Sequence, residues 1–214
     1  MKNRVSLASL GALIAVSISG GCAVGFGAYT AKLRGQSVRT TAPLVARRVA
    51  RKLVIVVDAQ RLPDAFQITN IRHSVTGFRP FMQDSLKNTL SSYFDNIVFV
   101  EKGAAMPSEP HLVAELQMNG VEGYNHVAGR LTYTILKMQW AFAVRPSEAE
   151  EYLFSFAGVA ASQPSYRTLD EGCQQMMQSA MHGLLSSWTK KKVHGQLRAL
   201  DQQPTMPTKV PVNT

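Results

Sequence analysis

KLVIVVD (residues 52–58) is the stretch of sequence that decides the fold. Five consecutive apolar residues, four of them β-branched, lie between Lys52 and Asp58. Such a continuous run is typical of a strand in the middle of a sheet, because a strand with one solvated face would alternate apolar and polar residues. The chain has 214 residues, which is room for one domain of ordinary size and short tails around that strand.

The residues after this strand predict a loop over 59–76 and then an amphipathic helix. The helix opens at Thr76-Gly-Phe-Arg-Pro80, where a proline in the first turn costs little because its missing N–H would have no partner there. One apolar stripe recurs every four residues along the helix: Phe78, Met82, Leu86, Leu90 and Phe94. Residues 97–101 then predict a second strand.

Three further strands and a second helix are predicted downstream. The strands cover residues 111–119, 131–144 and 152–161, with turns at 120–129 and 145–151. We expect the strands after the first helix to form antiparallel hairpins, since they follow one another directly. Ser165 or Thr168 then caps a helix that ends at Lys190–Lys192, and its apolar stripe includes Cys173 as a small buried residue.

The order β-α-β-β-β-β-α predicts an α+β fold, a two-layer α/β sandwich. The sheet is expected to be mixed and mostly antiparallel, with both helices on one face. The first crossover should be right-handed and join parallel strands. The predicted domain covers residues 52–192, and residues 193–214 are predicted to be a disordered tail because little in them can be buried.

The N-terminus has the features of a secretory signal. Lys2 and Arg4 precede an apolar run over residues 5–18, and small residues follow up to Cys22. Ser19-Gly20-Gly21-Cys22 resembles the lipobox of bacterial lipoproteins, in which the cysteine is acylated and becomes the first residue. The resemblance implies a signal peptide at 1–21 and lipid attachment at Cys22. The absence of an aspartate after the cysteine implies the periplasmic face of the outer membrane.

Two other interpretations of this segment stay open. The run remains apolar to Tyr29 and is long enough to span a bilayer, since a span needs about 20 residues. An uncleaved anchor would place the protein in the inner membrane. Cleavage without lipid attachment would instead release a soluble protein.

Residues 22–51 are predicted to be a basic tether. Seven basic residues and no acidic residue lie between Lys32 and Lys52, in a chain whose net charge is +9. Five of them are candidates for contact with anionic head groups at a membrane surface: Lys32, Arg34, Arg39, Arg47 and Arg48. A solvated connector explains the same charges. Nucleic acid is not an expected partner, because no set of stacking aromatic residues or recognition motif accompanies them.

The residue types needed for catalysis do not occur in recognisable patterns. The five histidines do not have metal-ligand spacing, and the chain lacks a nucleophile elbow, a P-loop and a dinucleotide fingerprint. We therefore expect no metal, no cofactor and no enzymatic activity. A hydrolase without a known motif is a third-ranked alternative.

The order of elements over residues 52–192 resembles a group of bacterial envelope lipoproteins with LptE-like, YajG-like or CsgG/TolB-N-like small domains. The resemblance implies a non-enzymatic adaptor or assembly factor that binds a protein partner or an envelope lipid. The alternative is an inner-membrane-anchored subunit of an export or motility machine. The oligomeric state does not follow from the sequence.

Overall fold

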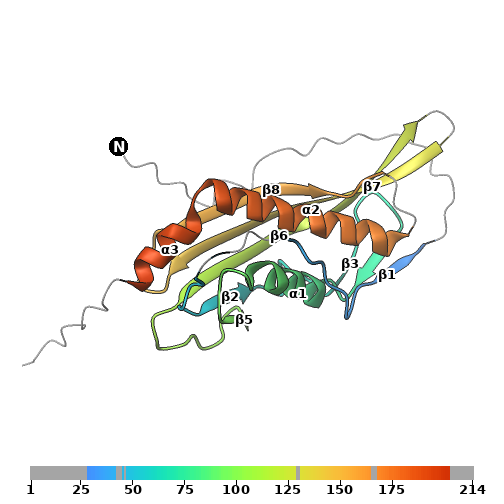
Figure 1. Ribbon diagram of the computed structural model, residues 1–214. Coiled ribbons are helices and arrows are strands. Elements are labelled where there is room, and N and C mark those ends of the chain that lie inside the picture. The colour runs from blue at the N-terminus through green and yellow to red at the C-terminus, as the bar shows by residue number, and fades with distance from the viewer. Residues whose placement is uncertain (1–27, 42–44, 46, 129–130, 165–167, 203–214) are drawn as a thin grey trace, which may run out of the picture.

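The computed structural model describes residues 28–41, 45, 47–128, 131–164 and 168–202, which form a mixed α+β fold (Figure 1). Helices lie over one face of a five-stranded sheet, so the predicted two-layer sandwich is confirmed. The sheet has the order β5-β2-β6-β7-β8. Its strands are β2 (Leu53–Val57), β5 (Ile97–Glu101), β6 (Leu112–Ala128), β7 (Leu131–Pro146) and β8 (Phe154–Ala161). The helices are α1 (Phe78–Leu90), α2 (Leu169–Lys190) and α3 (Val193–Asp201).

Strand β2 holds the central position that its apolar run predicts. It pairs in parallel with β5 on one side and with β6 on the other, so that Leu53 lies between Ile97 and Leu112. Leu53, Val54 and Ile55 are fully buried. The parallel pairing of β2 and β5 across α1 also agrees with the predicted first crossover.

The expectation that all later strands form antiparallel hairpins is wrong for β5 and β6. Strands β6, β7 and β8 are antiparallel neighbours, but β5 and β6 lie on opposite sides of β2. Four of the five apolar residues of β2 are buried, which fits an interior strand with a hydrogen-bonded neighbour at each edge. The chain therefore returns past β2 through residues 102–111 before β6 begins.

The predicted turn at 120–129 is also wrong, because β6 continues to Ala128. Gly120, with φ of 106°, lies in a bulge where the register with β7 shifts between Met118 and Val121. Gly123 lies against Ile71, whose Cδ1 would be 2.5 Å from a Cβ added to the glycine. Gly120 thus allows a bulge within the strand, and Gly123 allows the close approach of Ile71. The hairpin of β6 and β7 extends beyond the helices (Figure 1).

The folded unit is longer than the predicted bounds 52–192. A second, three-stranded sheet, with the order β1-β4-β3, consists of β1 (Thr30–Lys32), β3 (Ala65–Gln67) and β4 (Ser74–Thr76). Part of the predicted tether therefore belongs to a sheet, as does part of the predicted loop over 59–76. At the other end, Val193 and Leu197 of α3 are fully buried, where a disordered tail was expected.

The core lies between the helices and the main sheet. The five residues of the predicted stripe, from Phe78 to Phe94, are all buried there, but α1 ends at Leu90, four residues before Phe94. On α2, the Trp188 ring lies 5.0 Å from Phe154 and 5.7 Å from Tyr93, between centroids. Thr168 caps α2 as predicted, since its hydroxyl accepts from the Glu171 N–H at 3.2 Å.

Candidate functional site

The N-terminal segment over residues 30–40 is held against α1. The Val38 N–H donates to Ser85 Oγ at 3.1 Å, and Asn88 Nδ2 donates to Ser37 Oγ at 3.0 Å. Leu33 and Val38 are buried, so apolar packing adds to these hydrogen bonds. The basic residues of this segment therefore have fixed positions on the folded domain, instead of moving on a flexible connector.

Arg34 lies where α1 begins. Gly77 precedes the helix with φ of 73°, and a Cβ added to it would lie 2.5 Å from the backbone nitrogen of Arg34. Only a glycine fits there, because both the left-handed backbone and the close approach exclude a side chain. The Leu33 N–H donates to the Thr76 carbonyl at 2.9 Å and completes this contact.

The same segment also touches α2. The Lys32 N–H donates to Asp170 Oδ1 at 3.1 Å, and Gln174 Nε2 donates to Gln36 Oε1 at 2.8 Å. The segment thus bridges α1 and α2, and its Lys32 lies 138 positions from Asp170 in the sequence. These contacts hold the ammonium-bearing side chain of Lys32 at the surface beside the helices.

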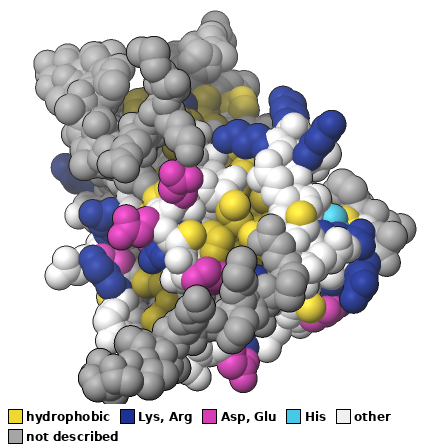
Figure 2. Space-filling view, turned by 90° about the vertical axis from the view of Figure 1, so that its left-hand side faces the viewer, with side chains coloured by type: hydrophobic (Ala, Val, Ile, Leu, Met, Phe, Trp, Pro, Cys, Tyr) yellow, Lys and Arg dark blue, Asp and Glu magenta, His cyan; other side chains and the backbone are white. Residues whose placement is uncertain are grey.

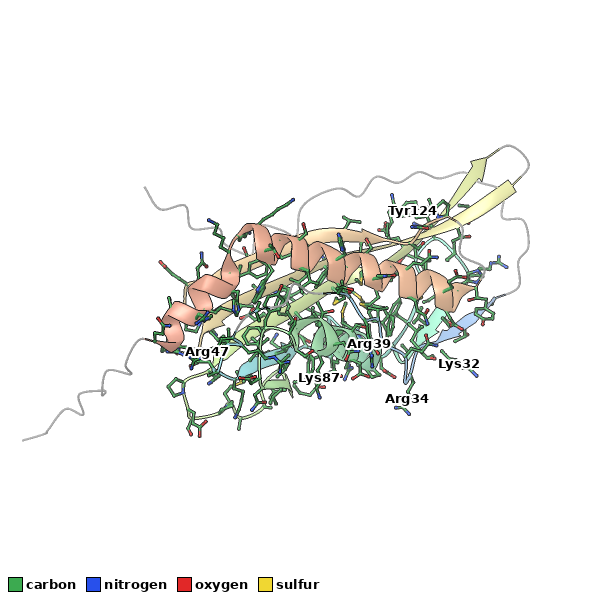
Figure 3. The ribbon with its side chains drawn as sticks, viewed as in Figure 1. Lys32, Arg34, Arg39, Arg47, Lys87 and Tyr124 are labelled. Carbon is green, nitrogen blue, oxygen red and sulfur yellow. The ribbon has the colours of Figure 1, made fainter. Side chains whose placement is uncertain are left out.

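Four exposed cations form what we call the basic surface: Lys32, Arg34, Arg39 and Lys87. Figure 3 shows them along the side of the molecule on which α1 lies. Among the described residues, none of the four makes an ion pair. Asp84 is an exposed acidic residue on α1, and Asp170 is occupied by the Lys32 backbone. This surface can attract an anion.

The five residues predicted for membrane contact separate into two groups. Lys32, Arg34 and Arg39 belong to the basic surface, and α1 adds Lys87, which the sequence did not single out. Arg48 forms an ion pair with Asp95 at 3.7 Å. Arg47 lies toward α3 (Figure 3), where its backbone interacts with the His194 ring. The signal that would have found Lys87 is its place between Ser85 and Asn88, which hold the segment.

The predicted lipid attachment residue, Cys22, and the predicted signal peptide lie outside the described residues. The first strand begins at Thr30, only eight positions after Cys22. Eight extended residues reach at most about 29 Å. The distance that the chain can cover between Cys22 and the fold is therefore much shorter than a tether of 30 residues would allow.

Groups with catalytic potential occupy structural positions. Cys173 is fully buried on α2, and burial raises the pKa of its thiol from 9.0 to about 12, with a smaller effect from Asp170. The Nδ1 atom of His111 lies 2.7 Å from the Glu109 carbonyl oxygen. Within the described ranges, no three histidine, cysteine or acidic side chains come together as metal ligands.

A second cluster that sequence reasoning missed joins the two ends of the described chain. Arg51 Nη1 donates to Glu148 Oε1 at 2.6 Å and Nη2 donates to the Leu200 carbonyl at 3.1 Å. The Ala50 N–H donates to Asp201 Oδ2 at 2.8 Å. These bonds hold α3 against the rest of the domain, and Arg51 therefore has a structural role.

Another face of the molecule has a different character. Figure 2 shows an apolar area surrounded by both acidic and basic side chains. The basic surface contrasts with this mixture. On the β6–β7 hairpin, an isolated cation, Lys137, lies 4.6 Å from the centroid of the Tyr124 ring, and the Tyr124 hydroxyl donates to Glu122. The Glu122 carboxylate raises the pKa of Tyr124.

Comparisons with known proteins find similar structures but do not assign the chain to a family. No family model and no curated protein matches the sequence. Over 82% of this chain and 99% of the other, the structure is similar to protein XCC0632 of the DUF330 family from Xanthomonas campestris, with 12% identity and a TM-score of 0.47.

Two further solved structures are similar over much of the chain. One is a minor lipoprotein from Acinetobacter baumannii, with 14% identity, a TM-score of 0.31 and coverage of 70% of this chain and 94% of that one. The other is a neuraminyllactose-binding hemagglutinin homolog from Helicobacter pylori, with 13% identity, a TM-score of 0.34 and coverage of 72% and 91%. Separately, no helix in the described part of the chain has the length and apolar character to cross a bilayer.

Proposed function

We propose that this protein is a non-enzymatic lipoprotein of the bacterial outer membrane, attached through acyl chains on Cys22 and acting as an adaptor or assembly factor. The observation that carries the proposal is the short distance along the chain between Cys22 and Thr30, where the fold begins. A lipobox-like cysteine shortly before a folded domain is compatible with lipid anchoring of that domain.

Acylation at this place has a direct physical consequence. Each buried CH₂ of an acyl chain contributes about 0.8 kcal/mol, so two or more chains hold a protein at a bilayer stably. The short connection then keeps the domain within about 29 Å of the lipid head groups. The domain is thus proposed to meet its partners at the membrane surface.

The proposal of a binding role is supported by how the polar residues are used. Arg51, Asp170 and Thr168 form structural contacts, and the Cys173 thiol is buried with a raised pKa. A thiol with a pKa near 12 is not a nucleophile at neutral pH, because the thiolate is the reactive form. The exposed cations of the basic surface are suited to binding an anionic partner.

The experiment that tests the anchor uses the two cysteines of the chain as a matched pair. The full-length protein is expressed in a bacterial host fed an alkyne analogue of palmitate, and incorporation is read by fluorophore coupling. We expect wild type and Cys173→Ala to be labelled and Cys22→Ala to be unlabelled. An unlabelled wild-type protein, or a labelled Cys22→Ala variant, contradicts lipid attachment at this residue.

The alternative is an inner-membrane subunit of an export or motility machine that keeps its N-terminal segment as an anchor. The apolar run that continues to Tyr29 favours this candidate. Membrane fractionation combined with the intact mass distinguishes the two. A full-length chain in the inner membrane supports the anchor, whereas an acylated chain that begins at Cys22 in the outer membrane supports the lipoprotein.

A further inference from the structure

We infer that the basic surface is a docking face for the anionic phospholipid head groups of the bilayer that holds the acyl chains of Cys22. This inference rests on the proposed function, because it places the face beside an anchored bilayer. It adds an orientation: the side of the domain that carries α1 faces the membrane, and the β6–β7 hairpin and α2 remain available to a partner.

The charge of the face carries the first step. The side chains of Lys32, Arg34, Arg39 and Lys87 are exposed and make no ion pair with any residue that the structure describes. Other cations form ion pairs within the protein. Arg51 pairs with Glu148, and Arg79 pairs with Glu101 at 3.2 Å. Exposed cations without ion pairs on one side create a local positive potential.

The acidic residues near the face reduce this potential. Asp84 is exposed one turn before Lys87 on α1. Asp170 accepts a hydrogen bond from the Lys32 backbone, so part of its charge is already stabilised. Asp64, whose carbonyl accepts the Phe78 N–H at 2.9 Å, and Glu171, next to Asp170 on α2, are further acidic residues near the face. These carboxylates offset part of the positive charge of the face.

The rigidity of the face carries the second step. Its cations come from two segments about 50 positions apart, which the Ser37–Asn88 and Val38–Ser85 hydrogen bonds hold together. A fixed array can meet a flat surface with all its charges at once, and it loses less conformational entropy than a flexible tether would. Arg47 and Arg48, which the sequence grouped with these cations, are held elsewhere, Arg48 by Asp95 at 3.7 Å and the Arg47 backbone beside the His194 ring.

The third step is reach. Lys32 is ten positions from Cys22, so an extended connection spans at most about 36 Å. The anchor therefore keeps the face close to the head groups, and the effective concentration of lipid at the face is high. Even a weak electrostatic attraction can then decide the orientation of the domain.

The test follows one probe on the face and one away from it, in the acylated full-length protein reconstituted into vesicles. Ser91→Cys places a thiol on the α1 side, one turn after Lys87, and Val159→Cys places one on β8, where the valine is 63% exposed. Each carries an environment-sensitive fluorophore. Cys173 does not compete for the label, because it is buried and its thiol pKa is about 12.

We expect the Ser91→Cys probe to be shielded from an aqueous quencher in vesicles that contain phosphatidylglycerol, but not in pure phosphatidylcholine. The Val159→Cys probe should be accessible in both. Raising the salt to about 1 M, where the Debye length is near 3 Å, should expose the first probe.

A charge variant and a matched control sharpen the result. Arg34→Gln/Arg39→Gln/Lys87→Gln removes three charges from the face, and Arg72→Gln/Lys190→Gln/Lys192→Gln removes three exposed charges elsewhere. The face variant should lower the ratio of shielded to accessible probe about fivefold per charge, on the order of a hundredfold in total. The control variant should leave the ratio within about threefold of wild type.

The outcomes are distinguishable from those of the anchor experiment. Equal accessibility of Ser91→Cys in both kinds of vesicle overturns the inference, even when mass spectrometry shows an acylated Cys22. Equal effects of the two triple variants also overturn it, since net charge alone would then explain the shielding. If the chain is not acylated, the probe is carried in a Cys22→Ala background so that the fluorophore reaches residue 91 alone. Shielding on anionic vesicles then means that the proposed anchor fails and the docking face stands.

Discussion

Arg51 Nη2 donates to the backbone carbonyl of Leu200 at a distance of 3.1 Å, which joins the chain before the first core strand to the last helix. The same guanidinium bonds Glu148 at 2.6 Å, and its side chain is only 14% exposed. The relationship shows that α3 is part of the folded unit. It also shows that a cation within a run of basic residues can have a structural use.

We predict that Arg51→Ala lowers the free energy of unfolding by about 2 kcal/mol, because a half-buried charged donor with several acceptors is lost. The control is Arg48→Ala, whose ion pair with Asp95 at 3.7 Å involves side chains that are 54% and 60% exposed. That variant should change stability by less than about 1 kcal/mol. Urea unfolding followed by circular dichroism measures both, and equal effects of the two changes would contradict a structural role for Arg51.

Gly123→Ala should destabilise the protein by about 1–3 kcal/mol, since the added Cβ would lie 2.5 Å from Ile71 Cδ1. Gly195→Ala on α3 is the matched control, because nothing lies within 4 Å of its added Cβ. It should stabilise the protein by about 0.5–1 kcal/mol through helix propensity. Thermal unfolding gives both values, and in the double variant Gly123→Ala/Ile71→Ala the cost of Gly123→Ala should be smaller. A cost that is the same with and without Ile71 would show that the close approach is not the cause.

The buried thiol of Cys173 predicts a loss of stability at alkaline pH. Its pKa is about 12 in the folded protein and near 9.0 in the unfolded chain, so the unfolded state loses its proton first. This contribution is fully present below about pH 9 and is lost as the pH rises toward about 12. Between pH 8 and pH 10, wild type should lose about 1 kcal/mol more than Cys173→Ala. Parallel pH profiles of the two proteins in urea unfolding would show that the thiol does not contribute.

Thr168→Ala should weaken the start of α2 by about 1 kcal/mol, because the Glu171 N–H loses its acceptor at 3.2 Å. Thr168→Ser keeps a hydroxyl at the same place and should retain nearly all the stability. Amide hydrogen exchange at residues 169–172 measures the effect locally. Faster exchange in both variants would indicate that the methyl group, and not the hydroxyl, holds the helix start.

The longer elements could be predicted because their patterns are local. The continuous apolar run of β2 indicated a central strand, and the four-residue repeat from Phe78 indicated the buried face of α1. The position of β6 was not predictable in the same way. Strand β6 could pair with β5, which precedes it in the chain, or with the free edge of β2. The choice depends on which pairing buries more of β2, and the sequence of neither strand alone shows this.

The candidate site shows the same division. Lys32, Arg34 and Arg39 were predicted from a run of positive charge, whereas Lys87 was missed because it lies outside that run, on a helix whose other cation is Arg79. Arg47, Arg48 and Arg51 belonged to the same run. In the folded protein, however, Arg48 forms an ion pair with Asp95 and Arg51 forms one with Glu148. A run of basic residues in the sequence indicates how many charges are present, but it does not indicate which of them form ion pairs in the folded protein.

By itself, the sequence determined the two-layer α/β sandwich and the central place of β2, and it narrowed the cap of α2 to Ser165 or Thr168, because each follows from residues that are neighbours along the chain. Tertiary structure alone decided the parallel pairing of β2 with β6, the packing of residues 30–40 on α1 and the docking of α3. The physical reason is that these contacts join segments tens of positions apart, and each depends on a few buried side chains and hydrogen bonds that exist only once both segments are in place.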